Sequence, residues 1–473
     1  MQNTFDLTAT QRQALIQQVQ TRLEKFYSQP DNQSVTPDAE PQEIIDFVRQ
    51  FDFKTLPTPQ AALDAVMEGL EKYQVHITNP MYYGLFNPRA NFASILADWI
   101  TATYNPQMAA WSHAPFAAEV EKYLVEAIGR KFGYTDSIDG TFASGGAEAN
   151  LTAVLCALNH AFPDFPQTGV FGMTQRPRIY CSAEAHHSVD KAAKCVGLGT
   201  DSVVHIPVTG EFEMDVNLLH QQIEADRKKG LRPLMIVGTA GTTGLGAIDD
   251  LNALSEVTTE FKLWFHVDAA YGGAVALHPE FREWITGIER SDSITFDIHK
   301  WLSVPMAASL FLTPHQEILQ RTFSMANNYM PPVDNAHQIV DPYEQSIQWS
   351  RRFIGLKLYL SLLFYGWNGY AQTIEHQQDM GDLLKTKLRE HGWLILNDSL
   401  LPIVCFTDPK HENDDTFPAK MYHKIVESGE AWLSVFPVDG KPTIRACITN
   451  YATQPADIEH LINLLNVLRK EVS

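Results

Sequence analysis

A lysine and an aspartate each follow an apolar segment of the chain, and together they could hold an aldehyde cofactor. Lys300 ends the segment SITFDIHK, and Asp268 lies 32 residues before it in the segment LWFHVDAA. A lysine amine forms a Schiff base with the aldehyde of pyridoxal 5'-phosphate (PLP), and a carboxylate keeps the pyridine nitrogen protonated so that the ring accepts electrons. The pair therefore favours a PLP site. A structural ion pair between the two residues is also compatible with this pattern.

The segments that would position these residues alternate between strands and helices from residue 76 to residue 345. Apolar runs predict strands at residues 140–144, 178–182, 202–208, 234–239, 263–270, 293–299 and 308–313. With helical segments between them, such runs predict an α/β fold with a mostly parallel sheet that is covered on both faces. Ligands of such sheets bind beyond the carboxyl ends of the strands, where Asp268 and Lys300 would lie.

Two further units are predicted around the large domain at residues 76–345. Residues 1–75 carry helical patterns, and we interpret them as an N-terminal arm. Residues 346–473 indicate a smaller α/β domain. Within the large domain, residues 315–345 are polar and contain prolines, which predicts a mobile loop. In the two terminal units we expect helices at residues 8–28 and 351–370 and strands at residues 403–407, 432–436 and 443–450.

Two glycine-containing turns and a pair of histidines follow other predicted strands. The sequence SGGAEAN at residues 144–150 leads into a helix, whose free N–H groups and positive end could bind a phosphate. The sequence GTTG at residues 241–244 could offer hydroxyl groups, and His186 or His187 could stack on a flat ring. Each segment by itself is also compatible with an ordinary polar turn or a structural histidine. Their position after strands of one predicted sheet favours a phosphate-binding cup beside Lys300.

The composition is that of a globular protein and excludes some partners. The 473 residues carry a formal net charge of −20, which argues against binding to nucleic acid or to an anionic membrane surface. We find no apolar run long enough to cross a membrane, no hydrophobic signal core and no Cys/His pattern typical of a metal site. Five widely spaced cysteines suggest reduced thiols in a cytoplasmic protein: Cys156, Cys181, Cys195, Cys405 and Cys447.

A set of motifs in consistent order resembles the group II PLP-dependent amino acid decarboxylases. The motifs are SGGAEAN, AEAHHSVDKA, GTTG, HVDAAYGG, DIHKW, WSRRFIGLK and IRACITN. The resemblance extends from about Pro80 to Asn450, and it implies fold type I, the aspartate aminotransferase fold. It also implies a homodimer whose active sites are built at the subunit interface.

The resemblance implies a role for each matched position around the cofactor. Lys300 would be the Schiff-base lysine and Asp268 the partner of the pyridinium. His186 would stack on one face of the ring, and Ala270 would lie against the other. Four further positions would lie near the phosphate or the ring: Gly146, Ala147, Thr243 and His299.

The same resemblance implies a reaction. Arg445 matches an arginine near the substrate carboxylate, and Tyr329 matches a loop tyrosine that reaches the neighbouring subunit's site and helps protonate Cα after CO2 leaves. We therefore expect removal of the α-carboxylate of an L-amino acid, with release of CO2 and the amine. Other chemistry on the same scaffold stays open, such as oxidative deamination, aldehyde synthesis or carbon–carbon cleavage, as does a non-catalytic relative.

The substrate pocket is the least defined part of the prediction. Four positions fall where the family recognises the substrate side chain: Leu85, Phe86, Gln107 and His113. Leu85 stands where aromatic decarboxylases have a tyrosine and glutamate decarboxylases have a glutamine, so the pattern names no substrate. Asp297 is a second departure, because some members have asparagine there. A carboxylate facing a phosphate is unfavourable, so we expect Asp297 to point away and to serve the structure only.

Overall fold

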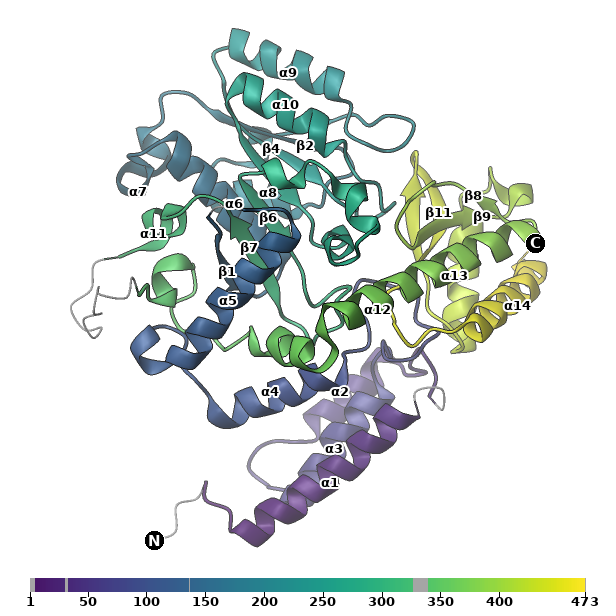
Figure 1. Ribbon diagram of the computed structural model, residues 1–473. Coiled ribbons are helices and arrows are strands. Elements are labelled where there is room, and N and C mark those ends of the chain that lie inside the picture. The colour runs from purple at the N-terminus through teal and green to yellow at the C-terminus, as the bar shows by residue number, and fades with distance from the viewer. Residues whose placement is uncertain (1–4, 30–32, 136, 326–338, 473) are drawn as a thin grey trace.

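Two β-sheets organise the chain in the computed structural model, which describes residues 5–29, 33–135, 137–325 and 339–472 (Figure 1). The larger sheet has seven strands in the order β1-β7-β6-β5-β4-β2-β3. Their bounds are β1 (Asp139–Ala143), β2 (Pro177–Ser182), β3 (Val203–Ile206), β4 (Arg232–Thr239), β5 (Trp264–Asp268), β6 (Ser293–Phe296) and β7 (Ser309–Thr313). Strands β6, β5, β4, β2 and β3 pair in parallel, whereas β7 pairs antiparallel with both of its neighbours. The predicted α/β fold with a mostly parallel sheet is confirmed.

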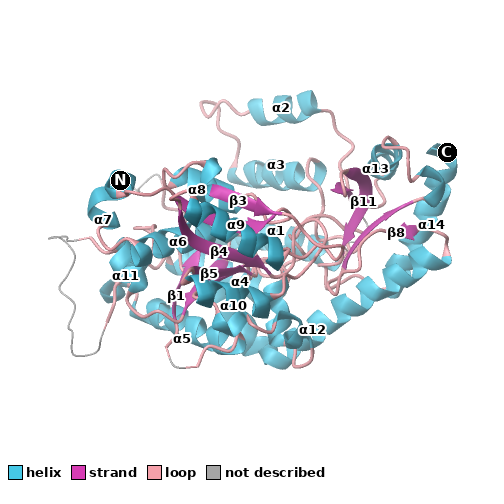
Figure 2. Ribbon diagram, turned by 90° about the horizontal axis from the view of Figure 1, so that it is seen from above, coloured by secondary structure: helices cyan, strands magenta, loops and turns pink. Residues whose placement is uncertain are grey.

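Helices cover both faces of this sheet, because its strands bury side chains on both sides (Figure 2). In β4, Ile236 packs in one core with residues of the covering helices α9 and α10, whereas Met235 and Val237 pack in another with residues of α6 and α8. Successive strand residues point to opposite faces, so near-continuous apolar strands require two cores. The covering helices are α5 (Pro115–Lys131), α6 (Gly146–Ala161), α8 (Ser188–Cys195), α9 (Val216–Lys228) and α10 (Leu251–Phe261).

The remaining helices extend the molecule at both ends of the chain (Figure 1). Thr8 caps α1 through a capping box with Gln11, which explains why that helix begins where the pattern predicted. The N-terminal helices are α1 (Ala9–Ser28), α2 (Pro41–Arg49), α3 (Pro59–Lys72) and α4 (Phe92–Tyr104). Short helices α7 (Phe165–Thr168) and α11 (Ile318–Phe323) lie beside the large sheet. None of the helices in the described ranges has the length and apolar character to span a bilayer.

The C-terminal part contains the smaller sheet, in the order β10-β11-β9-β8. Its elements are α12 (Leu356–Glu390), β8 (Leu394–Ile395), β9 (Ile403–Thr407), α13 (Phe417–Ser428), β10 (Ser434–Val438), β11 (Lys441–Cys447) and α14 (Pro455–Val472). The long helix α12 bends at Gly366 and connects the two sheets (Figure 1). These elements lie within the C-terminal unit predicted at residues 346–473, and its separation from the large domain stays a prediction.

Several predicted element bounds were wrong, including the end of the helix predicted at residue 370, and three of the differences have a clear physical reason. Strand β6 ends at Phe296 rather than at residue 299, because the chain turns there and the N–H of Lys300 bonds back to the carbonyl of Asp297. The segment 315–345 is not loop throughout, since α11 and a 3-10 turn at Pro342–Gln345 lie within it. Helix α12 begins at Leu356 rather than at residue 351, because Glu121 of α5 accepts the N–H groups of Ile354 and Gly355.

Candidate active site

The carboxyl ends of five strands bring the predicted residues to one edge of the large sheet. Strand β1 leads to Gly146, β2 to His186, β4 to Thr243, β5 to Asp268 and β6 to Lys300. These five strands run in the same direction, so their ends meet at the same edge. The sheet therefore gathers segments that are far apart in the sequence.

The amine of Lys300 lies between a carboxylate and an aromatic ring. Its Nζ is 3.0 Å from Oδ2 of Asp297 and 5.3 Å from the centre of the Phe86 ring. Phe86 packs against Tyr271, which stacks on Trp301. These contacts hold the amine at the edge of the core, where it is still partly accessible.

Asp297 is not the outward-pointing structural residue that we expected. Its carboxylate is buried, contacts Lys300, and lies so close to α6 that a Cβ on Gly146 would be 2.9 Å from Oδ2. The other oxygen, Oδ1, has no hydrogen-bond partner among the described residues. The prediction failed because it assumed that a carboxylate would avoid this end of the site, whereas the lysine three residues later supplies the compensating charge.

Asp268 is a buried acceptor that still has bonding capacity. Its side chain is 7% exposed, Oδ2 accepts a hydrogen bond from Nδ2 of Asn150 at 2.8 Å, and Oδ1 accepts one from the N–H of Ala270 at 3.1 Å. A carboxylate offers about four lone-pair positions. It can therefore accept a further N–H, such as that of a protonated pyridine.

The imidazole of His186 is held in a neutral form. Burial lowers the pKa of His186, the nearby charge of Asp268 opposes that shift, and the charge of Lys300 adds to it. Nδ1 lies 2.8 Å from Oγ of Ser188 and 3.2 Å from the N–H of the same residue. A neutral ring fixed in this way is suited to stacking on a flat cofactor.

The N-terminus of α6 offers a place for a phosphate. The first N–H groups of a helix, here those of Gly146 and Ala147, have no acceptor within the helix, and the helix dipole favours an anion there. His299 lies on the turn that carries Lys300, with Nδ1 2.6 Å from the carbonyl oxygen of Ala308, and burial lowers its pKa. Amine, carboxylate, flat ring and helix N-terminus together are the set of groups that PLP requires, so the residues fit this cofactor.

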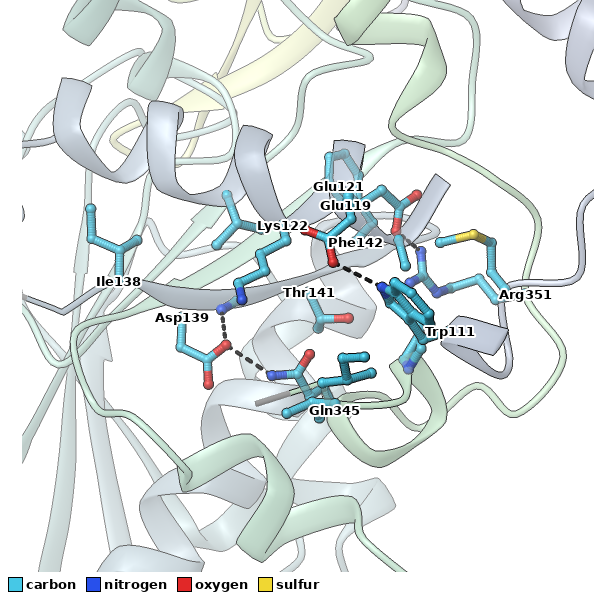
Figure 3. A pocket seen from close by; sticks show the side chains of 17 residues that line it. Trp111, Glu119, Glu121, Lys122, Ile138, Asp139, Thr141, Phe142, Gln345 and Arg351 are labelled. Atoms are coloured by element: carbon cyan, nitrogen blue, oxygen red, sulfur yellow. Dashed lines mark hydrogen bonds and ion pairs between the residues drawn. The ribbon is translucent and has the colours of Figure 1, made fainter. Parts of the chain in front are cut away.

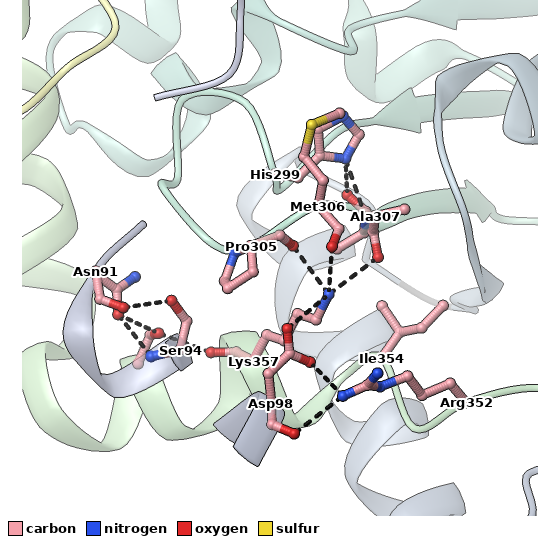
Figure 4. Close-up of polar contacts among 12 residues, drawn as sticks. Asn91, Ser94, Asp98, His299, Pro305, Met306, Ala307, Arg352, Ile354 and Lys357 are labelled. Carbon is pink, nitrogen blue, oxygen red and sulfur yellow. Dashed lines mark hydrogen bonds and ion pairs between the residues drawn. The ribbon is translucent and has the colours of Figure 1, made fainter. Parts of the chain in front are cut away.

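A second lysine fixes the turn that follows Lys300 (Figure 4). Lys357 of α12 is 3% exposed, and its Nζ donates to the carbonyls of Pro305, Met306 and Ala307 at 3.0, 3.3 and 3.3 Å. Burial lowers the pKa of Lys357, while Asp98, 3.6 Å away, raises it. Lys357 thus fixes the segment between Lys300 and β7 to helix α12.

Arg445 lies beside the site, but most of its donors are already used. Its guanidinium is 3% exposed and donates to the carbonyls of Thr243 and Gly244 at 2.7 and 2.9 Å. It also lies 5.2 Å from the centre of the Phe86 ring. In this conformation the arginine holds the GTTG turn, so contact with a substrate carboxylate would need a rearrangement of these bonds.

Of the other predicted substrate residues, Phe86 contacts Lys300, whereas Leu85, Gln107 and His113 show no hydrogen bond, ion pair or ring contact with it among the described residues. Leu85 is 54% exposed, Gln107 donates to Oγ of Ser350 at 3.3 Å, and His113 is an exposed residue beside Ser112. Within the described ranges, the polar contacts of Gln107 and His113 do not reach Lys300. Tyr329 lies outside the described residues.

A cavity of about 120 Å³ lies beside strand β1 (Figure 3). Its lining includes Trp111, Lys122, Asp139 and Arg351. The lining residues Asp139, Gly140, Thr141 and Phe142 belong to β1, so the cavity runs along that strand. None of the predicted site residues within the described ranges lines this cavity.

Sequence reasoning missed the polar residues that support Asp268 and His186. They are buried in the core between α6 and the sheet: Asn150, Ser188, His266 and Thr295. The available signal was polarity at positions where the strand or helix pattern required an apolar side chain. Asn150 and His266 both carry that signal.

Comparison with known proteins gives the family of this chain. Residues 49–408 match the model of the pyridoxal-dependent decarboxylase conserved domain. The chain is 29% identical to the aromatic-L-amino-acid decarboxylase of Bacillus atrophaeus, over 84% of this chain and 83% of the relative. It is 26% identical to the glutamate decarboxylase of Drosophila melanogaster, over 90% and 88%. The crystal structure of mouse CSAD has the same fold, with a TM-score of 0.92 at 24% identity over 98% of this chain and 99% of that chain.

These matches agree with the motifs from which the resemblance was inferred, and they cover the two strands that lead to Asp268 and Lys300. They also agree with a site whose amine, carboxylate and phosphate-binding helix fit PLP. The chain belongs to the pyridoxal-dependent decarboxylase family and is a PLP-dependent amino acid carboxy-lyase.

Proposed function

We propose that Lys300, Asp268 and His186 form the catalytic centre at which this enzyme removes the α-carboxylate of an L-amino acid. The observation that carries the proposal is the position of the Lys300 amine and the Asp268 carboxylate after two adjacent parallel strands, β6 and β5. Asp268 pairs in register with Thr295, five residues before Lys300. The sheet thus brings the two segments to one edge, with Asp268 at the end of β5 and Lys300 on the turn that follows β6.

Each residue has a defined task in this proposal. When bound, PLP supplies an electron sink for the electron pair that the departing CO2 leaves behind. Lys300 would hold the aldehyde carbon of PLP through its amine, with the aldehyde oxygen leaving as water, and the carboxylate of Asp297, 3.0 Å away, could take up the proton that the amine gives up. Asp268 holds a proton on the ring nitrogen, and His186 packs on the ring with Ala270 on the other face. Gly146 and Ala147 hold the phosphate, with Thr243 and His299 close to the cofactor.

The substrate is an L-amino acid whose side chain would contact Leu85, Phe86, Gln107 and His113, with Arg445 near its carboxylate. Phe86 supports this assignment, because it lies against both Lys300 and Arg445. The two curated relatives are named for aromatic amino acids and for glutamate. Both classes therefore belong in the first experiment.

That experiment is a substrate screen of the purified protein with PLP. Aromatic amino acids, glutamate, aspartate, cysteine sulfinate, diaminobutyrate and histidine are supplied one at a time, and CO2 and the organic product are identified by mass. CO2 with the matching amine supports the proposal and names the substrate. An aldehyde with ammonia or peroxide would replace simple decarboxylation by oxidative chemistry. A protein that does not bind PLP would contradict the proposed site.

A homodimer in the cytoplasm is part of the same proposal. Helices α1, α2 and α3 expose apolar side chains that a second subunit could cover: Ile16, Leu23, Ile45, Val48, Val66 and Leu70. The five cysteines are free thiols, as is usual in a reducing compartment. In such a dimer Tyr329 of one subunit would protonate Cα in the site of the other.

Mixing of two inactive variants tests the shared site. Lys300→Ala and Tyr329→Phe proteins are each expected to lose amine formation. After subunit exchange, a mixed dimer has one site with a native lysine and a native tyrosine, so activity should recover toward about a quarter of the native value. A pair of variants that exchanges subunits without regaining activity would show that Tyr329 serves its own subunit. A Tyr329→Phe protein that is fully active by itself would show that Tyr329 serves no step.

A further inference from the structure

One buried amide connects the two residues that would hold the cofactor ring. Asn150 lies in α6 and is 2% exposed. Its Nδ2 is 2.8 Å from Oδ2 of Asp268 and 2.8 Å from Oγ of Ser188. Its Oδ1 accepts from Oγ1 of Thr295 at 2.7 Å and lies 3.0 Å from Nε2 of His266. An amide has two N–H donors and two acceptor positions, and Asn150 uses all four.

The bonds of Asn150 form two branches, one through its oxygen to His266 and one through Ser188 to His186. In the first branch, the pattern fixes the direction of every bond. A carboxylate only accepts, so the NH2 group of Asn150 must face Asp268 and its oxygen must face His266. Nε2 of His266 therefore carries the proton. Its Nδ1 then accepts from Ser293, whose oxygen is 2.8 Å away and accepts in turn from Nε1 of Trp264. Burial lowers the pKa of His266 to about 4, so the ring is neutral near pH 7, as this chain of bonds requires.

The second branch sets the form of His186. Because Oγ of Ser188 accepts from Asn150, its own proton is free to donate to Nδ1 of His186, 2.8 Å away. The N–H of Ser188 also points to Nδ1, at 3.2 Å. Nδ1 therefore accepts two hydrogen bonds, and the ring proton of His186 must be on Nε2.

We propose that Asn150 is a positioning residue that orients the Asp268 carboxylate and sets the tautomer of His186 at the same time. This inference rests on the proposed roles of Asp268 and His186. A single amide on α6, the helix whose N-terminus would bind the phosphate, thus ties the phosphate end of the site to both groups that hold the ring. Loss of the amide would free the carboxylate to rotate, and it would weaken cofactor binding and catalysis together without touching the substrate.

The test uses the near-isosteric change Asn150→Asp in the full-length enzyme. The new carboxylate keeps the shape and the acceptor role, but it cannot donate and it repels Asp268. We expect the dissociation constant for PLP, measured by equilibrium dialysis without substrate, to rise about 10- to 100-fold. With saturating PLP, kcat should fall while KM for the amino acid stays within about twofold.

A buried asparagine of the same helix gives the matched control. Asn159 is also buried in α6, but among the described residues its side chain donates only to the carbonyl of Leu155 one turn earlier. Asn159→Asp should therefore leave PLP affinity and kcat unchanged. If the two variants weaken PLP binding equally, the effect belongs to the helix and the proposal is wrong.

Two further readouts keep the inference distinct from the proposed site itself. Ser188→Ala breaks only the branch to His186, and it should weaken PLP binding by a smaller factor and shift the His186 nitrogen resonances toward the other tautomer in the apo enzyme. Native affinity and native His186 resonances in both Asn150→Asp and Ser188→Ala would overturn the role of Asn150. Asp268→Asn is measured beside them, because native PLP affinity in that variant would instead refute the site on which the inference rests.

Discussion

The cofactor end and the substrate end of the candidate site differ in how completely one chain builds them. Around Asp268 and His186, polar groups are buried and paired through Asn150. Around Leu85 and Gln107, side chains are exposed and make few contacts. A buried polar network is costly unless each member is satisfied, so it has to be complete within the subunit. The substrate end can be completed by a second subunit and by the substrate, which fits the proposed dimer.

The largest effect is expected at the cofactor end, when the amine of Lys300 is removed. Lys300→Ala should lower kcat by more than about 1000-fold, because no other group would bind the aldehyde carbon and release the product. Borohydride reduction followed by peptide mass analysis should find PLP on Lys300 in the native enzyme and on no peptide of the variant. Lys191→Ala, an exposed lysine near His186, serves as the control. Trapping of PLP on another lysine at native yield would disprove the assignment.

The buried hydrogen-bond network around Asn150 should also make the free energy of unfolding depend on pH. The pKa of His266 is about 4 in the folded protein, against an ordinary value of 6.5, so between these values the unfolded chain binds more protons than the native one. Stability from this residue is complete above about pH 6.5 and is lost as the pH falls to about 4, and that loss amounts to roughly 3 kcal/mol of the free energy of unfolding.

Denaturant unfolding of the apo enzyme at several pH values measures this loss. His266→Gln should have a flatter profile across the same interval, although it is less stable at pH 7. A variant whose profile runs parallel to that of the native protein would show that His266 is not the neutral link that the hydrogen bonds describe.

Much of the cofactor end was predictable, because it depends on local patterns. The apolar runs that precede Asp268 and Lys300 can be recognised in the sequence, although the turn between β6 and Lys300 was not predicted. The role of Asn150 was not predictable, since an isolated polar residue in a helix does not reveal which strands it will face. The start of α12 was also missed, because it depends on Glu121, which is more than 200 residues away in the chain. The substrate end was predictable only in position, since in the proposed dimer its contacts would depend on groups of the second subunit.

A variant of Asp297 tests the boundary between the cofactor end and the substrate end. In Asp297→Asn, the amide cannot take the proton from Lys300, so capture of PLP by the apo enzyme should slow about tenfold or more. Stopped-flow absorbance of the bound cofactor measures the rate. Asp382→Asn is the matched control, because it removes a carboxylate with the same three-residue spacing from its lysine, Lys385, on α12. Equal capture rates in all three proteins would leave Asp297 without a role in proton transfer.

The smallest effect is expected at the substrate end. Leu85 is largely exposed and precedes Phe86, which contacts Lys300. Leu85→Gln adds one hydrogen-bonding group beside the substrate side chain, and one such bond is worth about 1 kcal/mol. The ratio of kcat/KM for acidic over aromatic amino acids should therefore rise by up to about tenfold, while PLP affinity stays unchanged. Leu400→Gln, at a similarly exposed leucine beyond α12, should change neither. If Leu85→Gln weakened PLP binding as strongly as Asn150→Asp, the two ends would not be separable, because a side chain at the substrate end would then be supporting the cofactor ring.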